Sequence, residues 1–308
     1  MKSQSMMTTN FIPSKWGRSR GATSLQQIAT DPRTWILAGA LASAGGRALG
    51  RWRTRYDLRN RTVLVTGGTR GLGLELARQA GLAGARVAIC GRDSDTLARA
   101  RENLSGTGMA ALALTCDVSD RHQVAELVRS VHTDLGPIDV LINNAGTTWG
   151  AATIDHPLEA WQKVVDLNLT AMFVVCQEVG RRSMLPRRQG KIINIASILG
   201  LVGGGDPGRP ATLAYNTTKG GVVNFTRSLA AEWAPYNINV NAIAPGFFPT
   251  KMTKGVMEMM GEAVAEKAPL KRVGGPEDLK GLTVLLASEA GAFITGQIVA
   301  VDGGVTAV

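Results

Sequence analysis

The chain is organised by a regular alternation of short β-rich runs with helix-compatible segments, which begins at Asp57. Runs of five to seven residues rich in Val, Ile, Leu and Thr have the length of buried strands, and seven follow one another: 62–66, 86–90, 109–115, 138–142, 191–195, 239–243 and 297–301. Helical patterns separate them: 72–83, 95–104, 124–133, 161–182, 213–233 and 277–288. The alternation predicts an α/β fold of the Rossmann type, a doubly wound parallel seven-stranded sheet with helices on both faces.

Two regions of different composition make up the chain. Residues 57–308 contain no internal repeat or low-complexity linker, so we expect one domain. Residues 1–56 form a basic N-terminal extension with nine Lys and Arg and a single acid, Asp31. Its apolar segment from Trp35 reaches Arg47 after about a dozen residues, too short to cross a bilayer. Three alternatives remain for it: a transit peptide, an interfacial helix in weak contact with a membrane surface, or a disordered or loosely docked leader.

The charge balance and the Cys and His content exclude some classes of function. The extension carries +8 of the net charge of +10, so residues 57–308 are nearly neutral and no nucleic acid is expected as a partner. The three cysteines, Cys90, Cys116 and Cys176, lie in or beside apolar runs, and neither they nor the three His have metal-type spacing. We expect buried thiols, no metal and a cytoplasmic protein, or one of an organellar matrix if the leader is a transit peptide.

A glycine-rich loop follows the first β-rich run. The pattern T-G-x-x-x-G-x-G spans Thr66 to Gly73, between an expected strand and an expected helix. Glycines there allow a tight turn and a close backbone approach to a diphosphate at the helix N-terminus. The candidate cofactor-binding residues of this loop are Gly67, Thr69, Arg70, Gly71, Leu72 and Gly73.

The end of the second β-rich run bears on which dinucleotide binds. A carboxylate at this position would bond the ribose 2′-OH and favour NAD, but the run ends in Gly91 and Arg92. Arg92 and Arg70 suit a 2′-phosphate, because guanidinium groups form strong charge-assisted bonds with phosphate oxygens. We therefore predict that the cofactor is NADP(H). The alternative is that both arginines are solvated surface residues that do not bind the cofactor.

Further candidates follow the third and fourth runs, since ligands of parallel sheets lie at the carboxyl ends of the strands. Asp117, followed by Val118, could accept a bond from the adenine amine or could cap a helix. Asn144, Ala145 and Gly146 close the fourth run, where small residues let the backbone meet the cofactor.

Tyr215 and Lys219 lie four residues apart in the helical pattern 213–233, on one face of the expected helix. A fixed ammonium favours the phenolate, so we expect it to lower the pKa of Tyr215 and suit the phenol to acid/base chemistry on a carbonyl or alcohol. Ser197, after the fifth run, would offer a hydroxyl to the same oxygen. Asn168 lies in the middle of an expected helix, where Asn is mildly unfavourable. Its presence there would be explained if its side chain held a water molecule and linked it to Lys219. The alternative is an amphipathic helix with a half-buried Tyr and a solvated Lys.

The order of these motifs, followed by Pro245-Gly246, resembles the short-chain dehydrogenase/reductase superfamily in its single-domain branch, over residues 57–308. The resemblance implies a catalytic tetrad of Asn168, Ser197, Tyr215 and Lys219, in which Tyr215 is the general acid/base and Lys219 also holds the nicotinamide ribose. It further implies cofactor contacts from Pro245, Gly246, Phe248 and Thr250. Tyr215 and Lys219 of the tetrad are also expected to bind the cofactor. The segment 294–304 is similar to the family's tetramer-interface strand, which implies a homotetramer or homodimer.

Two departures from the family pattern concern the substrate. Ser197 and Tyr215 are 18 residues apart because of an extra loop, 203–210, at the expected mouth of the site. The chain is also similar to 3-oxoacyl-carrier-protein reductases, and Arg187 and Arg188 fall near their basic docking residue. Tyr236 stands where a second basic residue is expected, which weakens the case for carrier docking.

The substrate itself is left open between two classes. An apolar lid could form from Trp149, Phe247, Phe248 and the methionines 252, 257, 259 and 260, or these could pack as an ordinary helix. The stretches 147–150 and 245–252 look like gluconate 5-dehydrogenases and rhamnolipid-type β-ketoacyl reductases. We predict an NADP(H)-dependent enzyme that interconverts a small-molecule ketone and a secondary alcohol, of the 3-oxoacyl type. A gluconate 5-dehydrogenase-like sugar-acid enzyme and a non-catalytic nucleotide-binding scaffold are the alternatives.

Overall fold

The computed structural model describes residues 55–203 and 211–308, and residues from Arg53 on form one compact unit. Its strands are β1 (Thr62–Thr66), β2 (Arg86–Gly91), β3 (Ala111–Thr115), β4 (Val140–Asn143), β5 (Gly190–Ile195), β6 (Ile238–Pro245) and β7 (Ile298–Val301). Its main helices are α3 (Gly71–Leu82), α4 (Ser94–Ser105), α5 (Arg121–Leu135), α6 (Leu158–Val165), α7 (Ala171–Val179), α8 (Leu213–Trp233), α9 (Lys254–Lys267) and α10 (Lys280–Ala287). The basic extension lies outside the described residues, apart from its last two.

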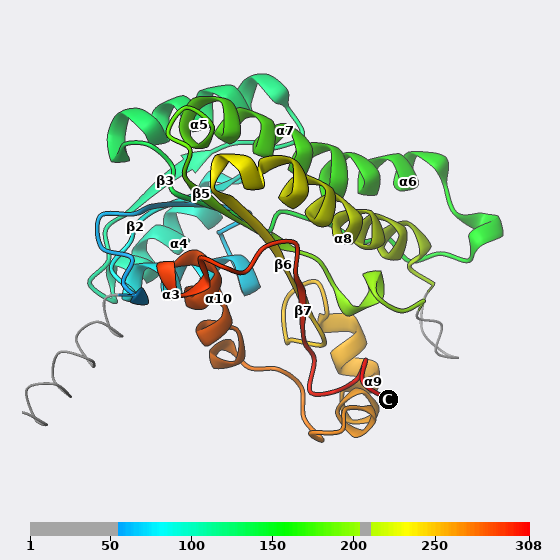
Figure 1. The fold of residues 1–308 in the computed structure, drawn as a ribbon. Helices are drawn as coiled ribbons and strands as arrows, with labels where there is room; N and C mark the ends of the chain where they lie inside the picture. Colours follow the sequence, from blue (N-terminus) through cyan, green and yellow to red (C-terminus); the bar gives the residue numbers. More distant parts are fainter. Residues whose placement is uncertain (1–54, 204–210) are drawn as a thin grey trace, which may run out of the picture. The chain divides into compact units, whose positions relative to one another are not determined.

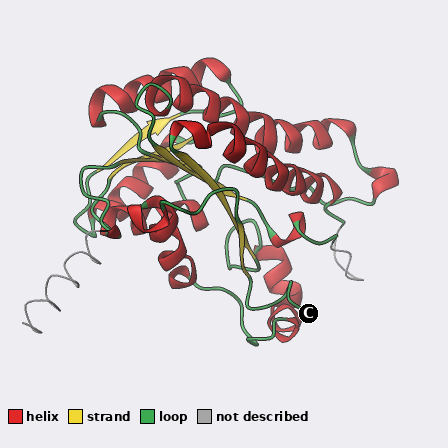
Figure 2. Cartoon of the chain, viewed as in Figure 1, coloured by secondary structure: helices red, strands yellow, loops and turns green. Residues whose placement is uncertain are grey.

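The seven strands form one parallel sheet in the order β3-β2-β1-β4-β5-β6-β7 (Figure 1). The strand order reverses between β1 and β4, and each crossover passes through helical structure (Figure 2). The predicted Rossmann-type doubly wound sheet is therefore confirmed. The crevice at the β1–β4 switch point is where such sheets bind ligands.

Successive residues along each strand face opposite layers, because side chains alternate across a sheet. Leu64 packs in the cluster that α5, α7 and α8 cover, whereas its neighbours Val63 and Val65 pack in the cluster under α3, α4 and α10. Figure 1 shows the same division of helices between the two faces of the sheet. Central strands such as β1 are buried on both faces, which explains their unbroken apolar sequences.

Two features differ from the sequence prediction. The segment expected as one helix over 161–182 begins at Leu158 and contains two π-helical turns, Asp166–Thr170 and Gly180–Met184, on either side of α7. Helix α9 was absent from the predicted alternation and was expected only as the alternative to an apolar lid formed by its methionines. Its residues include three methionines and two glycines without a clear amphipathic pattern, so periodicity alone did not mark it.

The amino ends of three strands are joined by the buried carboxylate of Asp139. Asp139 accepts a hydrogen bond from the backbone N–H of Thr62 at 2.9 Å and another from Arg187 Nη1 at 2.9 Å. Arg187 also donates to the carbonyl oxygen of Ile138. These contacts tie the starts of β1 and β4 to the turn before β5. We call this group the Asp139 cluster.

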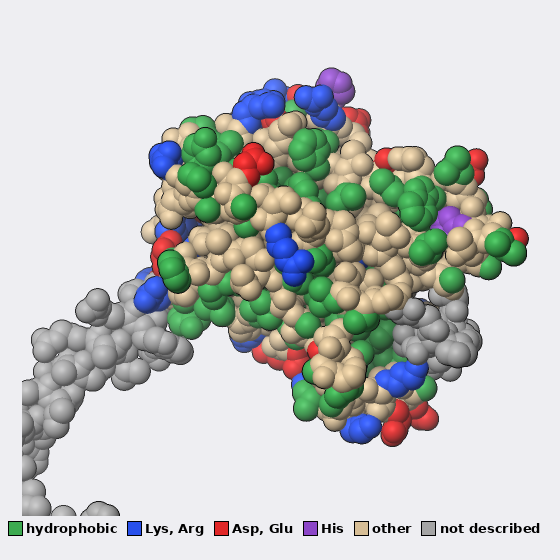
Figure 3. Space-filling model, turned by 45° about the vertical axis from the view of Figure 1, so that its right-hand side comes forward, with side chains coloured by type: hydrophobic (Ala, Val, Ile, Leu, Met, Phe, Trp, Pro, Cys, Tyr) green, Lys and Arg blue, Asp and Glu red, His purple; other side chains and the backbone are tan. Residues whose placement is uncertain are grey.

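The described residues bear on the remaining expectations of the sequence. Cys90, Cys116 and Cys176 are free and buried, as expected. No helix within 55–203 and 211–308 is long and apolar enough to cross a membrane. On the face drawn in Figure 3, basic and acidic side chains are interspersed, in keeping with the small net charge of residues 57–308.

Candidate active site

A cavity of about 780 Å³ lies at the carboxyl ends of the strands. Every residue predicted from the sequence to bind cofactor lines it: Gly67, Thr69, Arg70, Gly71, Leu72, Gly73, Arg92, Asp117, Val118, Asn144, Ala145, Gly146, Tyr215, Lys219, Pro245, Gly246, Phe248 and Thr250. Ser197 lines the cavity as well. These residues come from loops far apart in the sequence, and the parallel sheet brings the loops to one edge.

The glycine loop between β1 and α3 leaves room only for hydrogen at two positions. A Cβ on Gly73 would lie 2.3 Å from Asn144 Nδ2 and 2.3 Å from the carbonyl oxygen of Gly67. Gly67 itself has φ +62°, and its Cβ would lie 2.9 Å from Ala145 Cα. The first turn of α3 contains no acidic residue, and Arg70 before it makes no side-chain cap. The N–H groups and the positive end of α3 are thus available to an anion.

Thr66 and Asn144 fix the loop after β4 against this glycine loop. Thr66 Oγ1 accepts the backbone N–H groups of Asn144 at 3.0 Å and Ala145 at 3.2 Å. The Asn144 side chain donates in return to the carbonyl oxygens of Thr66 and Gly67, at 3.1 and 3.0 Å. The two loops therefore form one rigid wall of the cavity.

The part of the cavity near the end of β2 is rich in arginine. Arg92 is 64% exposed, and its Nη1 lies 3.9 Å from Asp117 Oδ2, so the pair is a loose surface contact that contributes little to stability. Asp93 accepts the backbone N–H of Thr96 at 2.7 Å, and this bond lowers the pKa of its carboxyl, with smaller contributions from the charges of Arg99 and Arg70. Arg70, Arg92 and Arg99 all line the cavity.

Lys219 is buried beneath the cavity floor, with 4% of its surface exposed. Its Nζ donates a 2.6 Å hydrogen bond to the carbonyl oxygen of Ile195 at the end of β5. Burial lowers the pKa of Lys219 to about 8. Its ammonium lies 5.6 Å from the centre of the Tyr215 ring.

Tyr215 is half-buried in the first turn of α8, and the pKa of its phenol is raised rather than lowered. Burial is the larger effect because it disfavours the phenolate, while a hydrogen bond with Ser197 acts in the opposite direction. The expected lowering by Lys219 is therefore not what this arrangement produces. Ser197 Oγ also accepts the backbone N–H of Leu199 at 3.2 Å, which fixes the orientation of its side chain.

Asn168 does not line the cavity but lies directly behind its wall, fully buried in the first π-helical turn. Its Oδ1 accepts the backbone N–H of Thr147 at 2.8 Å. Its Nδ2 donates to the Thr147 carbonyl at 2.9 Å and to Thr218 Oγ1 at 3.0 Å. The side chain thus ties the loop after β4 to α8, and both amide N–H groups already have partners. The predicted side-chain water remains a prediction.

The loop after β6 forms the remaining wall. Thr253 Oγ1 donates to the Phe248 carbonyl at 2.6 Å and accepts the Thr250 backbone N–H at 2.9 Å, which closes a compact turn. Gly246 donates to the Val301 carbonyl at 2.9 Å, so this loop is anchored on β7. Thr250 and Phe248 are held by contacts that do not depend on a ligand.

The predicted apolar lid is only partly assembled at the cavity. Phe248 and Met252 line it, whereas Phe247 lines a separate cavity of about 120 Å³ near the C-terminus. Trp149 and Met257 do not line the main cavity. The side chains of the methionines at 259 and 260, and the extra loop from 204 to 210, lie outside what the structure describes.

The structure reveals several contributors that the sequence did not mark. Thr66, Thr147 and Thr218 act through hydrogen bonds with partners 21 to 79 residues away, which no local pattern encodes. Lys251 and Arg99 also line the cavity. In the sequence, only their position after the predicted contacts Thr250 and Arg92 pointed to them.

Comparisons with known proteins agree with this geometry. A family model described as "Enoyl-(Acyl carrier protein) reductase" matches residues 67–306. Together with the parallel sheet and the relatives below, this match shows that the chain belongs to the short-chain dehydrogenase/reductase family, a family of oxidoreductases.

The relatives carry two kinds of name. The gluconate 5-dehydrogenase of Gluconobacter oxydans is 36% identical over 253 residues, which cover 82% of this chain and 96% of the relative. The rhamnolipids biosynthesis 3-oxoacyl-[acyl-carrier-protein] reductase of Pseudomonas aeruginosa is 37% identical over 254 residues, covering 81% and 97%. Among solved structures, a gluconate 5-dehydrogenase from Burkholderia cenocepacia in complex with NADP and tartrate is 34% identical, with a TM-score of 0.77 and coverage of 83% and 99%.

Proposed function

We propose that the protein is an NADP(H)-dependent oxidoreductase that interconverts a ketone and a secondary alcohol, with Tyr215 as the general acid/base. One observation carries the proposal most directly: Ser197, Tyr215 and Lys219 line the same cavity as a glycine loop whose backbone is open to a diphosphate. The cofactor supplies and accepts the hydride.

The protonation states of the site favour reduction at neutral pH. Because the pKa of Tyr215 is raised, its phenol remains protonated and can donate a proton to a carbonyl oxygen. Ser197, hydrogen-bonded to Tyr215, orients that oxygen. The Lys219 ammonium, held on Ile195, stabilises the negative charge that develops on the phenol oxygen as the proton leaves.

The arginines at the adenosine end support NADP(H) rather than NAD(H). The cavity end near Gly91 offers Arg92, Arg70 and Arg99, and Arg92 is held only by the loose contact with Asp117. A guanidinium so weakly paired can turn to a 2′-phosphate at small cost. Relatives solved with NADP bound support the same choice.

Apolar side chains that line the cavity favour a carbonyl substrate of the 3-oxoacyl type. Leu167, Phe248 and the exposed Met252 line it, whereas the exposed Leu201, Val202 and Leu213 flank Ser197 and Tyr215 only in sequence. An apolar lining suits an acyl chain better than a polyhydroxy acid. The gluconate 5-dehydrogenase names among the relatives make a sugar acid the second candidate.

Delivery on a carrier protein finds little support in the positions of its candidate residues. Arg187 belongs to the Asp139 cluster, and Arg188 lies over the Tyr236 ring at 5.3 Å and donates to the Pro235 carbonyl oxygen. Both arginines precede β5, at the amino edge of the sheet, whereas the cavity opens at the carboxyl edge. A free thioester is therefore the better-supported form of the substrate.

The deciding experiment follows NADPH consumption by the purified protein against a panel of carbonyl compounds. The panel holds acetoacetyl-CoA, a longer 3-oxoacyl thioester, 5-ketogluconate and simple diketones, each repeated with NADH. Turnover of the thioesters supports the acyl assignment, and turnover of the keto acid alone supports the sugar-acid candidate. The Tyr215→Phe variant should lose about 10²–10⁴-fold in kcat while it still binds NADPH. Unchanged turnover in that variant would refute the acid/base role.

We also infer a homo-oligomer, since β7 lies at an edge of the sheet and presents half-buried side chains. A mass measured by light scattering tests this point, and a monomer at micromolar concentration would contradict it.

A further inference from the structure

Lys251 follows Thr250 in the loop between β6 and α9, and nothing in the proposed chemistry accounts for it. Its side chain lines the main cavity. It makes no ion pair or hydrogen bond with any residue of the part of the chain that the structure describes. By contrast, Lys254, one turn further along, is paired with Glu258 at 3.6 Å.

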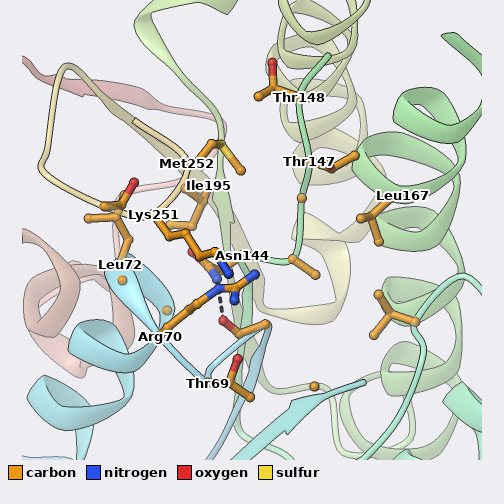
Figure 4. A pocket seen from close by; sticks show the side chains of 18 of the residues that line it. Thr69, Arg70, Leu72, Asn144, Thr147, Thr148, Leu167, Ile195, Lys251 and Met252 are labelled. Carbon is orange, nitrogen blue, oxygen red and sulfur yellow. Dashed lines mark hydrogen bonds between the residues drawn. The ribbon is translucent and has the colours of Figure 1, made fainter. Parts of the chain in front are cut away.

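The loop that carries Lys251 lies beside the glycine loop. Thr250 approaches Gly71 so closely that a methyl group added to Gly71 would lie 3.4 Å from Thr250 Cγ2 and 3.5 Å from its Cβ. Arg70 precedes Gly71 and Lys251 follows Thr250, so two cations flank this contact. Figure 4 shows both side chains reaching into the cavity, each from its own loop.

The charge at this point of the cavity is not compensated by acids. The lining contains five cations: Arg70, Arg92, Arg99, Lys219 and Lys251. It contains three acids, Asp93, Asp95 and Asp117, and all three follow β2 or β3 at the adenosine end. Arg70 and Lys251 lie on either side of the point where Thr250 approaches Gly71, beside the positive end of α3, in a cavity whose cations outnumber its carboxylates. This combination attracts a doubly charged anion.

We propose that Lys251 binds the diphosphate of the dinucleotide from the side opposite the glycine loop. The inference rests on the proposed NADP(H) cofactor and adds a contact to it. The Thr250–Gly71 contact places Lys251 beside the diphosphate cradle.

Calorimetric titration of the full chain with two ligands tests the proposal. NADP⁺ contains the diphosphate, whereas 2′-AMP contains the 2′-phosphate and lacks the diphosphate. In Lys251→Met, which keeps the length of the side chain but not its charge, the Kd of NADP⁺ should rise about tenfold, as expected for a lost charge-assisted bond. The Kd of 2′-AMP should change less than about twofold. Lys251→Arg should keep most of the affinity, and Lys254→Met, at the start of α9 and outside the cavity lining, is the control.

Each other outcome overturns the proposal in a distinguishable way. Equal Kd values for NADP⁺ in Lys251→Met and Lys254→Met would mean that the ammonium does not touch the diphosphate. A raised KM for the carbonyl compound with an unchanged Kd for NADP⁺ would assign Lys251 to the substrate instead. If the unaltered chain bound neither ligand, the proposed function itself would fall.

Discussion

Lys219 Nζ donates a 2.6 Å hydrogen bond to the carbonyl oxygen of Ile195, and through this bond β5 holds the helix that carries Tyr215. The bond fixes the ammonium at 5.6 Å from the centre of the phenol ring. Because the ammonium is buried with a single hydrogen-bond acceptor and no carboxylate, its position costs stability. The site therefore combines a precise arrangement with an energetic penalty.

We expect Lys219→Met to stabilise the cofactor-free protein while it abolishes turnover. Burial lowers the pKa of Lys219 from 10.5 to about 8, which destabilises the folded state by on the order of 3 kcal/mol at neutral pH. The substitution removes this penalty but also removes the hydrogen bond to Ile195, which stabilises the protein by about 1 kcal/mol. Chemical denaturation at pH 7 should show a gain of roughly 1–2 kcal/mol in the free energy of unfolding. A loss of stability in this variant would show that burial of the ammonium costs less than its lowered pKa indicates.

The same group predicts how stability depends on pH. Between pH 8 and 10.5 the unfolded chain binds the Lys219 proton and the folded chain does not, so the free energy of unfolding should rise with pH in this window. Below pH 8 the penalty is fully present in the folded state. The melting temperature of the unaltered protein, compared with Lys219→Met from pH 7 to 9.5, measures this contribution. Parallel curves for the two proteins would contradict it.

Arg92→Asp should reverse the cofactor preference. The substitution removes a guanidinium that is 64% exposed and only loosely paired, and places a carboxylate at the end of β2, where it can bond a ribose 2′-OH. We expect kcat/KM with NADPH to fall about 10–100-fold and that with NADH to hold or rise. Arg101→Asp, on the same helix as Arg99 but away from the cavity, is the control. An unchanged ratio between the two cofactors would exclude Arg92 as the phosphate contact.

Gly73→Ala should damage the cofactor site through packing alone. The added methyl would lie 2.3 Å from two atoms that are hydrogen-bonded to each other, Asn144 Nδ2 and the Gly67 oxygen. The two loops must separate, so we expect a loss of about 2 kcal/mol or more in stability and weaker NADPH binding. Gly281→Ala in α10, where the methyl meets open space, should instead stabilise the protein by about 0.5–1 kcal/mol. Thermal melts of the pair make the comparison.

Asn168→Ala should remove the ties between the loop after β4 and α8. The variant loses three hydrogen bonds, among them that of the N–H of the half-buried Thr147, so a cost of about 2–4 kcal/mol is expected. The KM for the carbonyl substrate should rise more than the Kd of NADPH, because Thr147 and Thr148 line the cavity beside Leu167. If kcat fell while KM was unchanged, the result would support the predicted proton relay through Asn168 rather than a role in holding the loop after β4 against α8.

The sequence predicted the strands and the topology class from local patterns, and the residues of the cavity from these patterns together with the family resemblance. Strand runs such as Thr62–Thr66 are marked by their own composition, and the parallel arrangement then brings the loop residues together. Helix α8 was predicted to the residue, since its pattern runs unbroken to the turn at Pro235.

Features that depend on distant partners could not be predicted in this way. The direction of the Tyr215 pKa depends on how deeply the phenol is buried, and spacing from Lys219 says nothing of burial. The partners of Asn168 and the engagement of Arg187 by Asp139 depend on atoms 21 to 50 residues away. The π-helical turns also required the structure, because their side-chain pattern resembles that of an α-helix.

The Asp139 cluster lies at the amino edge of the sheet and the cavity at the carboxyl edge, so the contacts that join the starts of the strands involve none of the residues that line the cavity. Substrate loops can therefore diverge without disturbing the contacts that join the strands. A fold arranged in this way can acquire a new substrate by a few changes at one edge while the other remains intact. This separation accounts for a chain that is equally similar to enzymes named for a sugar acid and for an acyl thioester.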